Sequence, residues 1–191
     1  MSRWIGIAAL ALCCLAPAQD DDISADDEPQ KTTSTGKEKK IPKNLKPVAS
    51  VIAGMDTVNA KPNLKAKYYI YLSSASWCGP CRALMPKIVE IYPAMKKKGV
   101  EILLLGADKN VEEVKQYAKS HKCKFPAIWG NDPLVRDLPG LEGGAGIPWA
   151  VYVTADGEQL GSVAANNPEK GILQWESIFL GKKATPHKKK K

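Results

Sequence analysis

The stretch SASWCGPCRALMP, Ser74 to Pro86, holds two cysteines separated by two residues. The residues before it, Lys67–Ser74, are rich in aromatic and branched side chains that favour strands, and they end in small residues. The apolar residues after it recur at spacings of four, three and four, as on one face of a helix: Leu84, Ile88, Ile91 and Met95. The sequence therefore predicts that the cysteine pair lies where a strand passes into a helix.

A cysteine at the start of a helix is well placed for redox chemistry. The first turn presents unpaired N–H groups and a partial positive charge, which lower the pKa of a nearby thiol. The thiolate is the form that attacks a disulfide. Cys78 precedes the predicted helix and is expected to be the exposed, activated sulfur, while Cys81 lies one turn in, within bonding reach. Gly79 supplies backbone freedom, and Pro80 supplies a preset φ for the first helical turn.

Two other interpretations of the pair remain open. The first is a permanent structural disulfide between Cys78 and Cys81. The second is a metal site that also recruits His121 and Cys123, although one CxxC followed by a single His-x-Cys does not have the spacing of a zinc site. The position at a helix start favours a redox-active pair, so we expect no metal.

Two more segments indicate strands. Val100–Ala107 contains a continuous apolar run, as in a strand that is covered on both faces. Trp149–Ala165 is typical of a hairpin, with two extended runs around a turn at Asp156 and Gly157. Together with Lys67–Ser74, these segments predict the strands of one sheet.

Helices are predicted between and after these strands. The helix that follows the cysteine pair should end before Gly99, which suits the left-handed residue beyond a helix. A second helix should begin at Asn110, whose side chain can cap it, and a third should run from Asn167 to Gly181. The order of elements predicts the α/β class, with a mixed central β-sheet flanked by helices on both faces.

Residues 1–18 have the pattern of an export signal. Arg3 supplies a positive start, residues 5–15 an apolar stretch, and Ala-Pro-Ala at 16–18 a small-x-small cleavage site. The apolar stretch is shorter than the roughly 17–25 residues of a membrane span. We therefore expect a cleaved signal peptide, with an uncleaved anchor as the alternative, and a periplasmic or extracellular protein.

Composition divides the remaining chain into three parts. Residues 19–44 are strongly charged, with almost no large apolar side chains, and are predicted to form a disordered spacer. Residues 45–181 have a globular composition and are long enough to bury a core. Residues 182–191 form a basic tail, predicted to be disordered, whose lysines supply much of the formal net charge of +8. Such a tail is suited to weak contact with the cell envelope or a membrane surface.

Signal cleavage would leave three cysteines: Cys78, Cys81 and Cys123. One pair and one leftover are too few for a domain held together by disulfides. Cys123 is expected to be a free thiol packed as a small hydrophobic side chain, with a regulatory or intermolecular disulfide as the alternative.

Two motifs resemble the thioredoxin superfamily. The first is WCGPC, Trp77 to Cys81, followed by arginine; the second, about 70 residues later, is AGIPWAVYVTADG, residues 145–157. The first motif looks like that of the tryparedoxin and nucleoredoxin branch and of exported TlpA-like thioredoxins. The resemblance spans roughly residues 65–181 and implies a thioredoxin-like fold.

The resemblance also implies roles for residues around the pair. Pro148 matches the family's cis-proline and is expected to be cis and to face the cysteines. Ile147, just before it, is expected to pair through its backbone with the substrate peptide. Trp77 matches the tryptophan beside the nucleophile, and it is expected to contact substrate together with Gly79 and Pro80.

One position departs from the family pattern. Thioredoxins carry a buried aspartate six residues before the first cysteine, which helps to deprotonate the resolving thiol. That position is Leu72 in this chain. The sequence leaves open whether another acid replaces it, and the resolving step or the redox potential is expected to differ accordingly.

The resemblance implies an exported thiol-disulfide oxidoreductase, with Cys78 as nucleophile and Cys81 as resolving cysteine. Its substrates would be protein disulfides and thiols, and the CGPC and Gly-Ile-Pro motifs resemble reducing members. A reductant needs an upstream electron donor, which the sequence does not identify. No cofactor and no nucleic-acid partner are expected, and the protein is expected to be a monomer. The alternative is a non-catalytic thioredoxin scaffold that binds a partner at the cell envelope.

Overall fold

The computed structural model describes residues 46–141, 146–163 and 168–181. The predicted signal peptide (1–18), spacer (19–44) and basic tail (182–191) lie outside these residues, as does the predicted helix cap at Asn167. Among the helices that are described, none is both long enough and apolar enough to cross a membrane.

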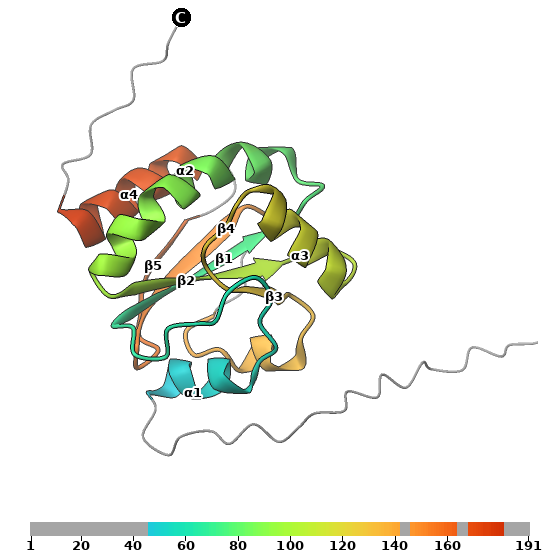
Figure 1. The fold of residues 1–191 in the computed structure, drawn as a ribbon. Coiled ribbons are helices and arrows are strands. Elements are labelled where there is room, and N and C mark those ends of the chain that lie inside the picture. The colour runs from blue at the N-terminus through green and yellow to red at the C-terminus, as the bar shows by residue number, and fades with distance from the viewer. Residues whose placement is uncertain (1–45, 142–145, 164–167, 182–191) are drawn as a thin grey trace, which may run out of the picture. The chain divides into compact units, whose positions relative to one another are not determined.

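A five-stranded mixed sheet runs through the described residues, in the order β3-β2-β1-β4-β5 (Figure 1). Strands β1, β2 and β3 are parallel to one another, while β4 is antiparallel to both β1 and β5. The strands are β1 (Tyr68–Ser74), β2 (Val100–Gly106), β3 (Ala127–Trp129), β4 (Trp149–Thr154) and β5 (Gln159–Val163). The mixed sheet predicted from the sequence is confirmed. Strand β3 was not predicted, because three residues are too few to show a periodic pattern.

Helices cover both faces of this sheet, as predicted (Figure 1). Helices α2, α3 and α4 contribute side chains to the core on one face, and α1 and the 3₁₀ helix η1 contribute to the core on the other. The helices are α1 (Pro47–Gly54), α2 (Gly79–Lys97), α3 (Val111–Ser120), η1 (Pro133–Asp137) and α4 (Pro168–Leu180). Helix α1 and η1 were not predicted; both are short, and α1 has no side-chain cap at its start.

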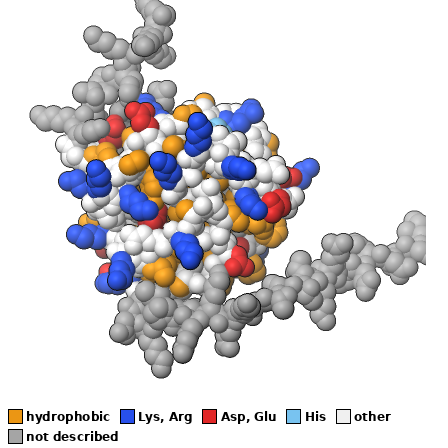
Figure 2. All heavy atoms as spheres, viewed as in Figure 1, with side chains coloured by type: hydrophobic (Ala, Val, Ile, Leu, Met, Phe, Trp, Pro, Cys, Tyr) orange, Lys and Arg blue, Asp and Glu red, His pale blue; other side chains and the backbone are white. Residues whose placement is uncertain are grey.

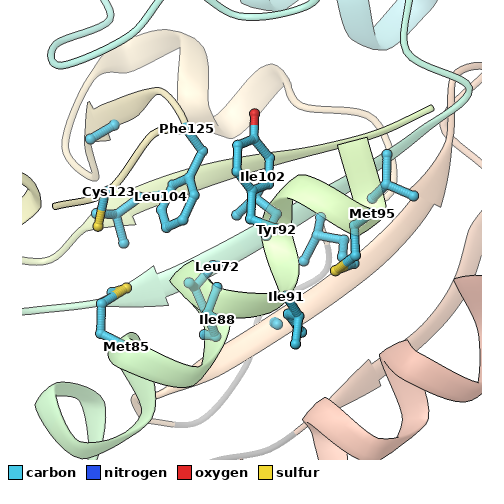
Figure 3. Close-up of a cluster of buried hydrophobic side chains, with 14 of the residues drawn as sticks. Leu72, Met85, Ile88, Ile91, Tyr92, Met95, Ile102, Leu104, Cys123 and Phe125 are labelled. Atoms are coloured by element: carbon cyan, nitrogen blue, oxygen red, sulfur yellow. The ribbon is translucent and has the colours of Figure 1, made fainter. Parts of the chain in front are cut away.

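The larger core lies between the sheet and α2 (Figure 3). Alternate residues of β2 point to opposite sides, so Ile102 and Leu104 join this core while Leu103 and Leu105 join the other. All residues of β2 are buried, as its continuous apolar sequence predicted. The buried stripe of α2 differs from the prediction at its start, because Met85 points inward and Leu84 is only half-buried.

The turns and caps follow the sequence signals. Asn110 caps α3 by accepting a hydrogen bond from the Glu113 N–H at 2.9 Å, and the Glu113 carboxylate reaches back to the Lys109 N–H. Gly99 follows α2 with a φ of 82°, and Gly157 has a φ of 90° in the turn between β4 and β5. These positive φ values favour glycine, which has no Cβ to clash.

Glu101 ties three segments together from a fully buried position at the start of β2. Its carboxylate accepts hydrogen bonds from the Tyr92 hydroxyl of α2 and from the backbone N–H of Asn63. Burial and this hydrogen bond raise the pKa of the Tyr92 hydroxyl, which keeps its proton for Glu101. The carboxylate thus satisfies a buried donor on α2 and a part-buried donor on the segment before β1.

Replacing Glu101 with leucine should destabilise the fold by about 2–4 kcal/mol, because the buried Tyr92 hydroxyl and the part-buried Asn63 N–H lose their acceptor. Glu112→Leu is the matched control, since Glu112 is exposed and a surface change of this kind costs about 0.5 kcal/mol or less. Urea denaturation of the three proteins measures the difference. Equal stabilities of the two variants would contradict this account of Glu101.

Cys123 is a free and buried thiol, 6% exposed, as predicted. Its backbone is held on both sides: its N–H donates to the Ala118 carbonyl, and its own carbonyl accepts from the Asn59 side-chain amide at 2.6 Å. Burial raises the pKa of the Cys123 thiol to about 12. A thiol of this kind is a packing residue that stays protonated and unreactive at neutral pH.

The buried thiol predicts a pH dependence of stability. An unfolded cysteine has a pKa of about 8.5, so between that pH and about 12 the folded state keeps the proton that the unfolded chain releases. The free energy of unfolding should therefore fall with pH in this window, and more steeply in the wild type than in Cys123→Ala. The slopes should differ by at most about 1.4 kcal/mol per pH unit. Denaturation of the oxidised proteins at pH 8 to 10.5 tests this, and parallel slopes would contradict it.

Candidate active site

Cys78 occupies the position just before the first residue of α2. Strand β1 ends at Ser74 and α2 begins at Gly79, so residues 75–78 alone connect them. Cys78 has an extended backbone, with φ −84° and ψ 109°, and Pro80 lies in the first turn of the helix. The predicted placement of the pair, at the passage from a strand to a helix, is confirmed.

The two cysteines form a disulfide, with Cα atoms 5.2 Å apart. The Sγ of Cys78 also accepts a hydrogen bond from the backbone N–H of Cys81, at 3.2 Å. After reduction, that N–H and the positive end of the helix would both stabilise a thiolate on Cys78.

The predicted exposure of Cys78 is wrong in this disulfide form. Cys78 is only 6% exposed and Cys81 1%, because Ala75 and Ile147 pack against the bonded pair. Cys78 is nevertheless the more accessible of the two.

Ile147 and Pro148 lie beside the cysteine pair, although Ile147 is 69 residues after Cys78 in the sequence. The Ile147–Pro148 peptide bond is cis, as the resemblance implied, and the Ile147 carbonyl oxygen is 3.8 Å from Cys78 Sγ. The sheet explains this meeting, since β4 runs antiparallel to β1 and Trp149 lies opposite Ser73. The residues just before β4 therefore lie beside the residues just after β1.

The other predicted substrate-contacting residues are exposed and lie next to Cys78 in the sequence. Trp77 is 64% exposed, and its indole N–H donates to the Ala107 carbonyl at 3.3 Å. Gly79 and Pro80 are also exposed. The structure thus brings all seven predicted site residues together, while their roles toward a substrate stay predictions.

Asp108 is a residue of this site that the sequence analysis missed. It is 3% exposed, and one carboxylate oxygen accepts from both the N–H and the hydroxyl of Ser76, at 2.9 and 2.7 Å. It also receives the Trp129 indole N–H on its backbone carbonyl. The available signal was its position just after a buried parallel strand, because the carboxyl ends of β1 and β2 meet at one edge of the sheet.

A second polar contact lies at the same edge of the sheet, where β1 ends. The Tyr117 hydroxyl of α3 lies 2.8 Å from the hydroxyl of Ser74, the last residue of β1. Burial raises the pKa of Tyr117 to about 12, so this hydroxyl stays protonated at neutral pH. The connection from β1 to α2 is therefore held by side chains from α3 and from the residues after β2.

Leu72 is buried, and none of the described acids lies beside it in the place of the family's aspartate. It lines a small space below Pro148, and none of the described residues around that space can ionise: Leu72, Leu84, Pro148, Trp149, Ala150, Val163, Gly171 and Trp175. Of the described residues, the buried carboxylates are Glu101 and Asp108, which bond to Tyr92 and Ser76. The described residues also contain no cluster of three or more potential metal ligands.

Comparison with known proteins agrees with this architecture. Residues 66–138 match a thioredoxin-like protein family. A thiol-disulfide oxidoreductase ResA of Bacillus thuringiensis is 30% identical over 101 residues, which cover 52% of this chain and 56% of the relative. A nucleoredoxin of Danio rerio is 31% identical over 147 residues, 71% of this chain and 35% of the relative. The chain thus matches about half or less of the length of these relatives.

A solved structure shares the fold. The solution structure of a thiol:disulfide interchange protein from Bacteroides sp. is 21% identical, has a TM-score of 0.50, and is matched over 61% of this chain and 76% of that chain. The family match, the order of strands and the cysteine pair at the start of α2 lead to one conclusion: the described residues form a thioredoxin-like domain.

Proposed function

We propose that this protein is a thiol-disulfide oxidoreductase that exchanges disulfides with protein substrates through Cys78 and Cys81. The main support is the position of Cys78 at the amino end of α2, where its sulfur accepts the Cys81 N–H. A bonded partner one turn further along lets the pair open and close with little backbone movement. The names of the ResA relatives point in the same direction.

The first step is attack by the Cys78 thiolate on one sulfur of a substrate disulfide. A bond forms between Cys78 and that sulfur, the substrate S–S bond breaks, and the other substrate sulfur leaves as a thiolate that takes up a proton. The positive end of α2 and the Cys81 N–H stabilise the attacking thiolate. We propose that the substrate contacts Trp77, Gly79 and Pro80, which are exposed and close to Cys78 in the sequence. The backbone of Ile147, whose carbonyl oxygen is 3.8 Å from Cys78 Sγ, is proposed to pair with the substrate chain.

The second step releases the substrate. Cys81 loses its proton and attacks the Cys78 sulfur, so that the mixed disulfide breaks and the remaining substrate sulfur leaves as a thiolate. The substrate has then gained two electrons, and Cys78 and Cys81 are joined in the disulfide that the structure contains. An external dithiol must supply two electrons to reopen it.

The apolar surroundings of Cys81 make the second step the slower one. Cys81 is 1% exposed, and it packs with Ala75 and Ile147, neither of which has a side chain that can take its proton. Burial without a nearby cation or base disfavours a thiolate. The departing substrate thiolate or water is left as the proton acceptor.

The wider setting of this activity is proposed from the sequence. The export pattern of residues 1–18 supports a periplasmic or extracellular protein, and the CGPC motif supports action as a reductant with an upstream dithiol donor. The basic tail, residues 182–191, supports weak contact with an envelope or membrane surface. We further propose that the protein acts as a monomer.

Substitution of Cys78 should abolish activity. Cys78→Ser is expected to lose reduction of an insulin disulfide in the presence of dithiothreitol, because no other described thiol combines a helix start with access to solvent. Iodoacetamide should modify Cys78 first in the reduced wild type and leave Cys123 unmodified, as mapped by mass spectrometry. Cys123→Ala is the matched control and should keep the activity.

The opposite pattern would support a binding module instead. If the wild type reduces no disulfide, and capture of a partner survives Cys78→Ser, the protein is a scaffold that binds without turnover.

The slow second step predicts an accumulating intermediate. When reduced wild-type protein is mixed with a disulfide substrate and quenched with acid, a mixed disulfide through Cys78 should be detectable by mass spectrometry within the first turnover. Cys81→Ser should convert this transient species into a stable one. A wild-type reaction with no trace of the intermediate would show that Cys81 is deprotonated rapidly, against the reasoning from its surroundings.

A further inference from the structure

A groove opens beside the cysteine pair at the carboxyl edge of the sheet. It has a volume of about 500 Å³ and lies between the end of β2, η1 and the start of β4. It meets the site at two points: Ile147, whose carbonyl lies next to Cys78 Sγ, and Ala107, whose carbonyl holds the Trp77 indole. A polypeptide bonded to Cys78 would therefore have this groove next to its point of attachment.

The groove combines apolar walls with one cation. Leu105, Val135 and Trp149 supply apolar side chains, and Asn131 supplies an amide. Arg136, from η1, is exposed and is the one charged side chain among the described residues that line the groove. Apolar walls with a few placed polar groups are the usual composition of a binding site.

The Arg136 guanidinium is available to a ligand. The ion pairs found among the described residues join Lys46 to Asp156 and Lys115 to Glu112, so Arg136 takes part in neither. A guanidinium can hold a carboxylate through two parallel N–H donors.

Among the described residues, no carboxylate lines the groove, although the exposed Asp137 directly follows Arg136. Asp108 is buried and turned onto Ser76, and Asp132 caps η1 by accepting the Leu134 N–H. On the face shown in Figure 2, Lys and Arg side chains are widely spread and Asp and Glu side chains lie mostly toward its margins.

We propose that this groove binds the substrate segment next to the attacked cysteine, and that Arg136 selects segments with an acidic side chain near that cysteine. This inference rests on the proposed thiol-disulfide exchange and adds the class of substrate. The apolar walls hold the segment, while Arg136 discriminates between charges at the position that reaches it.

Peptides with a single changed position test this selection. Each peptide carries one cysteine as a mixed disulfide with 2-mercaptoethanol. Glu, Gln or Lys is placed, one position at a time, two to five residues before or after that cysteine. Rates of exchange with the reduced protein are measured at low and high salt. At one or two positions the Glu peptide should react about two- to fivefold faster than the Gln peptide, and salt should reduce the difference.

Variants of the chain assign the preference to Arg136. Arg136→Gln should make the Glu and Gln peptides react at equal rates, and Arg136→Glu should favour the Lys peptide. Lys119→Gln is the matched control, because Lys119 is an exposed cation in the last turn of α3 and does not line the groove. It should keep the wild-type preference.

Two results would overturn the inference while leaving the proposed function intact. One is equal rates for Glu and Gln peptides at every position in the wild type, and the other is a preference that survives Arg136→Gln. If the wild type fails to react even with 2-hydroxyethyl disulfide, a small uncharged substrate, the proposed function itself is wrong and this inference falls with it.

Discussion

The short connection from β1 to α2 is the constraint on which the site depends. Because residues 75–78 alone join the strand to the helix, the sulfur of Cys78 has little choice of position: it lies at the amino end of α2, within reach of the Cys81 N–H. That N–H is one of the donors that a helix start leaves without a partner in its own helix. The same geometry that ends the strand thus provides the electrostatic environment of the nucleophile.

Residues outside the connection hold it in place. Asp108 fixes it through Ser76, and the backbone after β2 fixes it through the Trp77 indole. The parallel pairing of β1 with β2 brings these supports to the cysteines, and the antiparallel pairing of β1 with β4 brings Ile147 from the other side. The central strand β1 therefore organises the site from both of its edges.

The parts of the fold that could be predicted are those with long periodic patterns or a local turn signal. Strands β1 and β2, helix α2 and the Asn110 cap all have such signals, and so does the cysteine pair. Strand β3 and η1 could not be predicted, because they are short and form through tertiary contacts: β3 pairs with Leu104, Leu105 and Gly106 of β2. Asp108 lies just after the buried strand β2, but only the pairing of β1 with β2 shows that it meets Ser76. Nothing local marks Arg136 as a residue that lines the groove.

Helix α2 is anchored at two distant points. Its first turn is joined to the redox pair, and Tyr92, three turns further along, is bound to the carboxylate of Glu101 at the opposite edge of the sheet. A helix held at these two points is not free to translate along its axis or to rotate about it. We therefore expect reduction of the disulfide to change the structure only at the amino end of α2. The oxidised and reduced forms would then have the same backbone structure elsewhere and differ only at the sulfurs. Backbone amide shifts of the two forms that changed around Glu101 would show a transmitted movement instead.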